Sequence, residues 1–102
     1  MNGQNFSFHG YLPVDSLEKK KTIAHLEQES LKKRSAQIFI ETPYRNNQLI
    51  KDLFQFCHPQ TKICIAVDIT APTQWIKTKT VAQWKKETVD IHKRLAIFLL
   101  QA

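Results

Sequence analysis

The segment IFIETPYR, residues 38–45, gathers side chains of the types that bind small polar ligands. The carboxylate of Glu41 can accept hydrogen bonds, the guanidinium of Arg45 can hold a phosphate or a carboxylate, and the ring of Tyr44 can stack on a flat ligand. Thr42–Pro43 suits a helix start, because threonine caps free N–H groups and proline lacks the first of them. Since open α/β sheets bind ligands where a strand ends and a helix begins, this junction is a candidate binding site.

The same junction also has a purely structural explanation. Glu41 and Arg45 can form an ordinary ion pair at a helix start, and Tyr44 can be an aromatic residue at the edge of the core. Thr42–Pro43 is then a plain helix cap. A second acidic residue, Asp68, ends the apolar run IAVDIT, where it can orient a ligand or form a turn. Residue types alone leave both explanations open at each position.

The two cysteines and a neighbouring histidine are residue types that could form a metal site. Cys57, His58 and Cys64 have the spacing C-H-x5-C, which contains metal-ligating residue types. Both cysteines, however, stand in apolar surroundings, LFQFCH and KICIAV, and no fourth ligand is evident. We therefore expect reduced cysteines that pack in the core, and no metal.

These residues must be positioned by secondary structure that the hydrophobic pattern predicts. The expected elements are strand 4–9, helix 16–34, strand 36–41, helix 43–58, strand 62–69, strand 75–80, helix 81–87 and strand 95–100. Asp15 with Glu18, and Thr80 with Gln83, have capping-box spacing and mark two helix starts. The apolar run 62–69 is typical of an interior strand covered on both faces, whereas 4–9 alternates as a half-buried strand does.

The order of these elements predicts an α/β domain. Strand, helix, strand, helix, strand, strand, helix, strand is the order expected of a mixed sheet of about five strands with flanking helices. A length of 102 residues fits one domain with one core, and 42% hydrophobic with 24% charged residues is a globular composition. We expect a single α/β domain.

The net charge and the hydropathy of the sequence limit the classes of molecule that this chain is expected to bind. Fifteen Lys+Arg against nine Asp+Glu give a formal charge of +6, which attracts polyanions such as RNA. The same excess is also compatible with a solvated basic surface, because the lysines crowd the two ends of the helix over 16–34. No apolar run of about eighteen residues and no signal peptide is present, so we expect a cytoplasmic protein without membrane contact.

Motifs of complete enzyme sites are missing from the chain. Its two glycines, Gly3 and Gly10, form no dinucleotide-binding or phosphate-binding loop. No Ser-His-Asp order, H-E-x-x-H or C-x-x-C is present. The chain also enters a strand almost at its first residue. We therefore expect one lobe of a longer protein.

Four segments carry a resemblance to a known family. FHGYLP, IFIETPYR, IAVDIT and the closing IFLL resemble, in the same order, motifs of the tetrapyrrole methylase superfamily of S-adenosylmethionine-dependent methyltransferases. They are most similar to the branch that methylates a ribose 2′-oxygen in small-subunit ribosomal RNA. The resemblance covers nearly all of residues 1–102, but only the carboxy-terminal lobe of the family. The amino-terminal lobe, with its glycine-rich cofactor loop, has no counterpart in this sequence.

The resemblance implies where ligands would bind. Members of the family hold S-adenosylmethionine in the cleft between their lobes, and the matching cofactor positions here are Thr42, Pro43, Ala66, Val67, Asp68, Ile69 and Thr70. Glu41, Tyr44 and Arg45 match positions that face the cleft on the substrate side. No catalytic residue can be assigned from this chain. Catalysis would be an in-line methyl transfer that depends on orientation, and the lobe alone should be inactive.

Three functions are compatible with these observations. The first is the carboxy-terminal lobe of a methyltransferase that acts on small-subunit ribosomal RNA. The second keeps the lobe but changes the substrate to a tetrapyrrole or another small molecule. The third is a non-catalytic module that binds RNA or dimerises. The expected partners are ribosomal RNA, the amino-terminal lobe and, because the family commonly forms dimers, a second copy.

Overall fold

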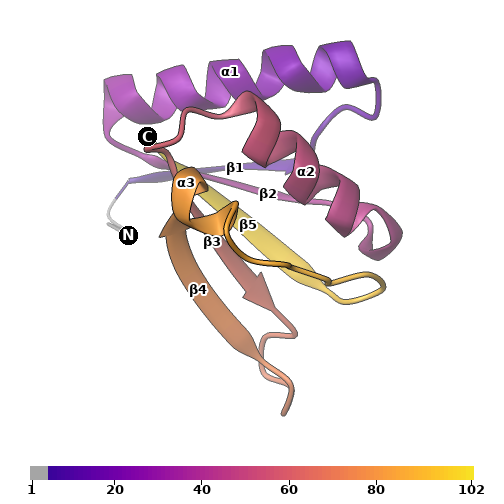
Figure 1. Cartoon of the computed structure of the whole chain (residues 1–102). Coiled ribbons are helices and arrows are strands. Elements are labelled where there is room, and N and C mark those ends of the chain that lie inside the picture. Colours follow the sequence, from indigo (N-terminus) through magenta and orange to yellow (C-terminus); the bar gives the residue numbers. More distant parts are fainter. Residues whose placement is uncertain (1–4) are drawn as a thin grey trace.

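The computed structural model describes residues 5–102, in which helices pack against one mixed sheet of five strands (Figure 1). In chain order the elements are β1 (Phe6–Tyr11), α1 (Ser16–Lys33), β2 (Ala36–Ile40), a 3-10 turn η1 (Pro43–Arg45), α2 (Asn46–Phe56), β3 (Lys62–Val67), β4 (Trp75–Thr80), α3 (Val81–Trp84) and β5 (Ala96–Gln101). The strands lie in the order β1-β2-β5-β3-β4. β1 and β2 are parallel, whereas β5 is antiparallel to β2 and β3, and β4 to β3. The predicted α/β class and mixed sheet are confirmed.

Element boundaries differ from the sequence prediction at several places, among them the end of β3, which lies at Val67 instead of residue 69. The strand expected over 4–9 lies at Phe6–Tyr11, and its first expected residue is outside the described part of the chain. The second helix is preceded by the 3-10 turn η1, so its α-helical part begins only at Asn46. The third helix is shorter than expected and ends at Trp84, although the predicted capping box of Thr80 and Gln83 is present.

Helix α1 is fixed at both ends by local hydrogen bonds. The side chain of Asp15 accepts a hydrogen bond from the Glu18 N–H at 3.0 Å, as the capping pattern predicts. Arg34 takes a left-handed conformation with φ 50° and its N–H donates to the Ser30 carbonyl, which ends the helix.

Within residues 5–102, no helix is long and apolar enough to cross a membrane.

One lysine of α1 departs from the expected solvated face. Lys19 is 5% exposed, and its Nζ lies 2.9 Å from Oδ2 of Asp52 on α2. The other carboxylate oxygen of Asp52 accepts a hydrogen bond from Gln48 at 3.0 Å. Because a buried charge is costly unless it is paired, this ion pair fixes how α1 and α2 lie against each other.

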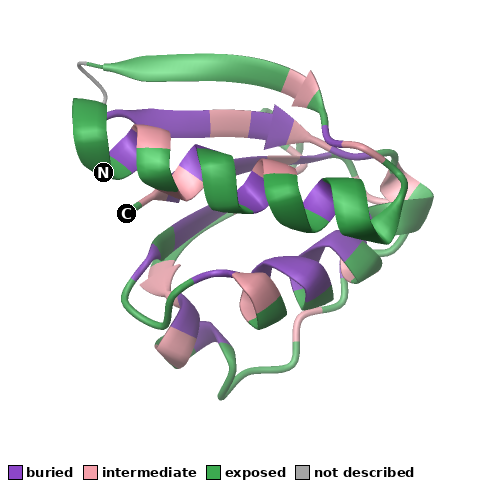
Figure 2. Ribbon diagram, turned by 90° about the horizontal axis from the view of Figure 1, so that it is seen from above, coloured by how far each residue is buried: buried purple, intermediate pink, exposed green. Residues whose placement is uncertain are grey.

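The core lies between the helices and one face of the sheet. All three helices are on the same side of the sheet in Figure 1, and Figure 2 shows buried residues along the sides of the helices that face the strands. Phe39 of β2 stacks on Phe98 of β5 with ring centroids 5.9 Å apart, and neither ring is exposed. The indole Nε1 of Trp84 donates to the carbonyl of Ile63 at 2.8 Å, which attaches α3 to β3. Burial of these large side chains supplies most of the stabilisation.

The opposite face of the sheet, here named the open face, is not covered by a helix within the described residues. The strand register places on it Phe6, Phe8, Tyr11, Ala36, Ile38, Ile40, Lys62, Cys64, Ala66, Ile76, Thr78, Thr80, Ile97, Leu99 and Gln101. Phe6, Phe8 and Tyr11 are each more than 60% exposed, and Figure 2 shows β1 exposed along most of its length. The half-buried strand expected near residue 6 is therefore an exposed edge strand.

The interior strand expected over 62–69 is confirmed by the burial of Ile63 to Val67. Its second face, however, is covered differently from the prediction. Cys64 and Ala66 lie on the open face at 7% and 5% exposure. Side chains of the neighbouring strands flank them, since Cys64 pairs with Leu99 and Ala66 with Ile97. A second helical layer is absent from the described residues.

Candidate cofactor site

A cavity of about 320 Å³ lies at the edge of the sheet where β1, β2 and β3 end and β5 begins. It is lined by Tyr11, Ile40, Glu41, Pro43, Ala66, Ile69, Leu95, Ala96 and Ile97. The volume is at the small end of the range for ligand pockets. Because the carboxyl ends of the parallel strands meet here, the cavity occupies the position at which α/β sheets bind ligands.

Tyr11 reaches the cavity because of an irregularity in β1. The pairing of β1 with β2 shifts register between Phe8 and Tyr11, and Gly10 between them has φ 68°. Regular alternation from Phe8 would point Tyr11 to the helix side, but the bulge pairs it with Ile40 on the open face. A left-handed residue is needed at this point, and glycine adopts that conformation without a Cβ penalty.

Glu41 follows β2 directly and is only 8% exposed. Its Oε1 accepts a hydrogen bond from the Thr42 N–H at 2.8 Å, which fixes the carboxylate against its own backbone. Within residues 5–102 it forms no ion pair with Arg45, so the structural explanation of these two residues does not apply. The carboxyl group is a hydrogen-bond acceptor in the wall of a mostly apolar cavity.

Thr42 and Pro43 begin a 3-10 turn. Thr42 is extended, with φ −64° and ψ 143°, and its side chain makes no capping hydrogen bond, contrary to the prediction. Its carbonyl accepts the Arg45 N–H at 2.8 Å, and Pro43 occupies the first position of the turn as expected. The Pro43 carbonyl accepts the Lys93 N–H at 2.9 Å, which ties this turn to the loop before β5.

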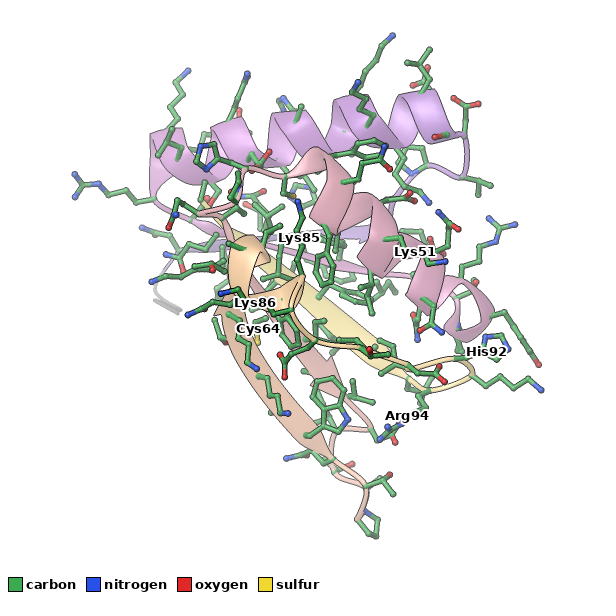
Figure 3. The ribbon with its side chains drawn as sticks, in the orientation of Figure 1. Lys51, Cys64, Lys85, Lys86, His92 and Arg94 are labelled. Carbon is green, nitrogen blue, oxygen red and sulfur yellow. The ribbon has the colours of Figure 1, made fainter. Side chains whose placement is uncertain are left out.

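The 3-10 turn directs Tyr44 and Arg45 away from the cavity. Both are exposed, and neither contributes to the cavity lining. The Tyr44 ring meets the His92 ring edge-on at 5.8 Å, and Nζ of Lys93 lies 5.9 Å from the Tyr44 ring centre. Figure 3 shows His92 on the loop close to the start of α2. These residues form a separate aromatic and basic group at the rim of the molecule.

The five positions predicted at the end of β3 and in the turn after it have different places in the structure. Ala66 and Ile69 line the cavity, whereas Val67 is fully buried on the helix side. Asp68 and Thr70 lie in the turn that follows and take left-handed φ values of 52° and 72°. Of the predicted site residues, the cavity therefore brings together Glu41, Pro43, Ala66 and Ile69.

Asp68 holds the turn after β3 in place. Its Oδ2 accepts hydrogen bonds from the Thr73 hydroxyl at 2.8 Å and from Nε of Arg94 at 2.9 Å. The Thr73 hydroxyl, followed by Arg94, lowers the pKa of Asp68 from its ordinary value. Arg94 also donates to the Thr73 carbonyl at 2.9 Å, and Figure 3 shows it beside this turn. Asp68 orients backbone at the cavity and does not line the cavity itself.

Sequence reasoning missed the residues that β5 contributes. Leu95, Ala96 and Ile97 form one wall of the cavity, and Arg94 anchors the turn opposite. The run LAIFLL predicts a strand but contains nothing that indicates its neighbours in the sheet. The Gly10 in FHGYLP is the one local signal that could have located Tyr11, because a glycine inside a strand often marks a bulge.

The two cysteines lie on opposite sides of the sheet. Cys57 is in the core at the end of α2, where burial, with a smaller contribution from Glu27, raises the pKa of its thiol. Cys64 is on the open face of β3, and both thiols are free. Within residues 5–102 no group of three or more His, Cys, Asp or Glu side chains is arranged to hold a metal ion.

Solved structures share this fold. CbiF, described as a cobalt precorrin-4 methyltransferase of cobalamin biosynthesis, matches with a TM-score of 0.57 at 18% identity, over 97% of this chain and 41% of that one. The methyltransferase CobJ matches at 0.56 and 15% identity, over 96% and 41%. Uroporphyrin-III C-methyltransferase from Thermus thermophilus, solved with S-adenosylhomocysteine, matches at 0.50 and 12% identity, over 97% and 42%. Identities this low establish the shared fold alone.

The chain spans only 41–42% of the length of these structures. No protein-family model matches the sequence. No curated protein matches it either.

Proposed function

We propose that this chain is the carboxy-terminal lobe of an S-adenosylmethionine-dependent methyltransferase whose substrate is a tetrapyrrole or a related small molecule. The observation that carries the proposal is the cavity at the ends of β1, β2 and β3, in a fold shared with three methyltransferases. One of these was solved with S-adenosylhomocysteine, the demethylated product of that cofactor. The remaining wall of the cofactor cleft would come from a second lobe.

The lining of the cavity fits part of such a cofactor. Its walls are mostly apolar, formed by residues such as Ile40, Ala66 and Ile97, which suits a flat ring or a thioether. Glu41 adds one carboxylate, whose Oε1 is already engaged by the Thr42 N–H. Its other oxygen makes no hydrogen bond to residues 5–102 and can accept one from a ribose hydroxyl or an amino group. When bound, the cofactor supplies an electrophilic methyl group.

The residues of this lobe would act by orientation. Ile40, Leu95 and Ile97 exclude water from one side of the cavity, and the Asp68 turn holds Ile69 at its mouth. Alignment of the nucleophile with the methyl group can supply much of the rate enhancement of such a transfer. Glu41 would fix the ligand through a hydrogen bond, and we assign no catalytic base to this lobe.

The substrate assignment differs from the one that the sequence motifs favoured most. The CbiF and uroporphyrin-III enzymes are named for tetrapyrrole substrates, whereas the motifs most resemble an RNA-methylating branch. A tetrapyrrole with several carboxylates would also be attracted by a chain of charge +6. We therefore favour the tetrapyrrole class.

Methylation of ribosomal RNA is the second candidate, because of the aromatic and basic group at the rim. The Tyr44 ring is 69% exposed, with Lys93 near its face and Arg45 next in sequence. An exposed ring flanked by cations suits a stacked base with neighbouring phosphates. A strong decrease of RNA affinity with salt, lost in Tyr44→Ala, would favour this candidate over the first.

Titration with S-adenosylhomocysteine tests the cofactor site. We expect weak binding that moves the amide NMR signals of Glu41, Ala66 and Ile69. Ala66→Phe should abolish these changes because the added ring fills the cavity. Thr78→Phe is the matched control, since it adds the same ring to the open face outside the cavity lining. Signal changes confined to other parts of the chain, or equal binding by both variants, would contradict the site.

A further inference from the structure

Strand β4 forms one edge of the sheet, and no strand pairs with its outer side within the described residues. This outer side is here named the β4 edge. In an edge strand every second residue directs its N–H and C=O groups away from the sheet, where another extended chain can pair with them. β4 runs over six residues, Trp75–Thr80, and pairs with β3 without a shift in register. The β4 edge is therefore long and regular enough to accept a further strand.

Two lysine side chains stand at alternate positions along the β4 edge. Lys77 and Lys79 both point to the helix side of the sheet. Nζ of Lys77 lies 5.8 Å from the ring centre of Trp75, and Nζ of Lys79 lies 5.3 Å from that of Trp84. The rings favour these positions of the ammonium groups through cation–π attraction. Two positive charges are thus presented at a spacing of two strand residues, about 7 Å.

Positive charge around β4 is poorly balanced by acidic side chains. Lys62, at the start of β3, and Lys85 and Lys86, after α3, add to the two lysines of β4. Within residues 5–102, Lys79 is the one member of these five lysines that forms an ion pair, and its partner is Glu87. The region therefore attracts a partner that carries negative charge.

A hollow of about 430 Å³ lies along the β4 edge. It is lined by Thr78 and Lys79 of β4, by Gln83 of α3, and by Lys86 and Glu87, which follow α3. Thr78 is on the open face and Lys79 is on the helix side, so a hollow that touches both lies at the border between the two faces. Figure 3 shows Lys86 beyond α3, close to β4. A strand added to the β4 edge would occupy this position.

The charges of the β4 edge disfavour a second copy of this chain as its occupant. Two β4 edges would bring their lysines together, and lysines on edge strands commonly prevent such pairing. The other strands offer no better match, because none of the five described strands contains Asp or Glu. The same lysines attract a strand that carries carboxylates, since opposite charges on neighbouring strands stabilise the pair.

We infer that the β4 edge binds an extended acidic segment of another protein by strand addition. The backbone of the segment pairs with the outward N–H and C=O groups of β4. Acidic side chains at every second position lie beside Lys77 and Lys79 on the helix side. The apolar side chains between them lie beside Ile76, which is 55% exposed on the open face. The recognised sequence is therefore an alternation of Asp or Glu with apolar residues.

This surface is separate from the cofactor cavity. Ile76, Lys77, Thr78 and Lys79 do not line that cavity. The segment and a cofactor can therefore be bound at the same time, and the inference stands or falls independently of the proposed function.

Titration with the peptide Ser-Glu-Val-Glu-Val-Glu-Val-Ser, followed by amide NMR of the labelled chain, tests the inference. We expect the signals of residues 76–80 to move and the affinity to fall as salt is added. Lys77→Glu should raise the dissociation constant roughly tenfold or more, because repulsion replaces attraction. Lys20→Glu is the matched control, since Nζ of Lys20 also lies 5.8 Å from an aromatic ring, that of Phe56, but on α1. It changes the net charge equally and should leave the dissociation constant nearly unchanged.

Changes to the peptide distinguish strand addition from attraction of any polyanion. The same peptide with Lys in place of Glu should not bind. A peptide methylated on all its Glu and Val backbone nitrogens keeps its charges but has no N–H for pairing, and it should not bind either. No binding of the parent peptide, or equal weakening by Lys77→Glu and Lys20→Glu, would overturn the inference. Equal binding of the methylated peptide, or a stronger response of residues 76–80 to polyuridylate RNA than to the parent peptide, would identify a general polyanion surface and overturn it as well.

Discussion

The two faces of the sheet are built from the same strands but have opposite surroundings. Phe98 points to the helix side and has no exposed surface, whereas its neighbour Leu99 points to the open face and is only partly buried. The same difference separates Phe39 from Ile38 on β2. Composition does not separate the faces, because both rows of side chains are apolar. The position of the helices decides which row becomes the core of the single chain.

The largest expected effect tests the difference between the two faces at neighbouring residues of β5. Phe98→Ala should lower the free energy of unfolding by about 3–5 kcal/mol, because it empties the space beside Phe39. Leu99→Ala should cost only about 1 kcal/mol, because its side chain is already partly exposed. Urea unfolding of both variants measures the two values. Equal costs for the two variants would contradict the distinction between the faces.

A smaller effect is expected at the bulge that adds Tyr11 to the open face. Gly10→Ala should destabilise the fold by about 1–2 kcal/mol, because φ 68° is unfavourable for a residue with a Cβ. Crowding is not the cause, since a Cβ placed at Gly10 meets no atom within 4 Å. Gly10→Asn is the control and should cost less, because asparagine tolerates the left-handed region. Thermal unfolding measures both, and equal losses in the two variants would exclude the conformational explanation.

The smallest expected effect concerns Asp68, which holds the turn after β3 beside the cavity. The Thr73 hydroxyl and Arg94 lower the folded-state pKa of Asp68, so this carboxylate stabilises the fold when it is ionised. Its contribution is fully present above the unfolded-state pKa of about 3.9 and disappears as the pH falls through the lower folded-state pKa. Denaturant unfolding should show a stability difference between the parent and Asp68→Asn near neutral pH, and the difference should vanish in acid. A difference that does not change with pH would show that Asp68 acts through its shape alone.

The features that could be predicted from the sequence are those set by neighbouring residues. The caps at Asp15 and Thr80 depend on residues three positions away: the capping box of Thr80 and Gln83 is complete, whereas at Asp15 the structure shows only the hydrogen bond from the Glu18 N–H to the Asp15 side chain. The strand and helix order was also right, because hydrophobic period is a local signal. Pairing of β5 between β2 and β3 depends on residues far apart in the chain, and no pattern in LAIFLL indicates it.

The candidate site was predicted only in part. Glu41 and Ala66 were assigned to one cleft by the family resemblance, and the structure places both in the lining of one cavity; their role there stays a prediction. Tyr44 and Arg45 were assigned to the substrate side of the cleft by the family resemblance, with an α-helix expected to begin at Pro43. The 3-10 turn changes their direction, and its contact with Lys93 comes from a loop distant in sequence. A pattern of neighbouring residues could not distinguish an α-helix that begins at Pro43 from a 3-10 turn over Pro43–Arg45 that precedes the helix.

The position of β5 has a consequence for the order in which the fold can form during synthesis. β5 lies between β2 and β3, yet it follows β1 to β4 in the chain. A nascent chain that has emerged only as far as β4 therefore exposes one unpaired edge on β2 and another on β3. Two separate strand pairs, β1 with β2 and β3 with β4, can form early, but they join into one sheet only when the final strand inserts between them. We expect such late, long-range pairing to be slow, so the incomplete sheet is most exposed to aggregation during this interval.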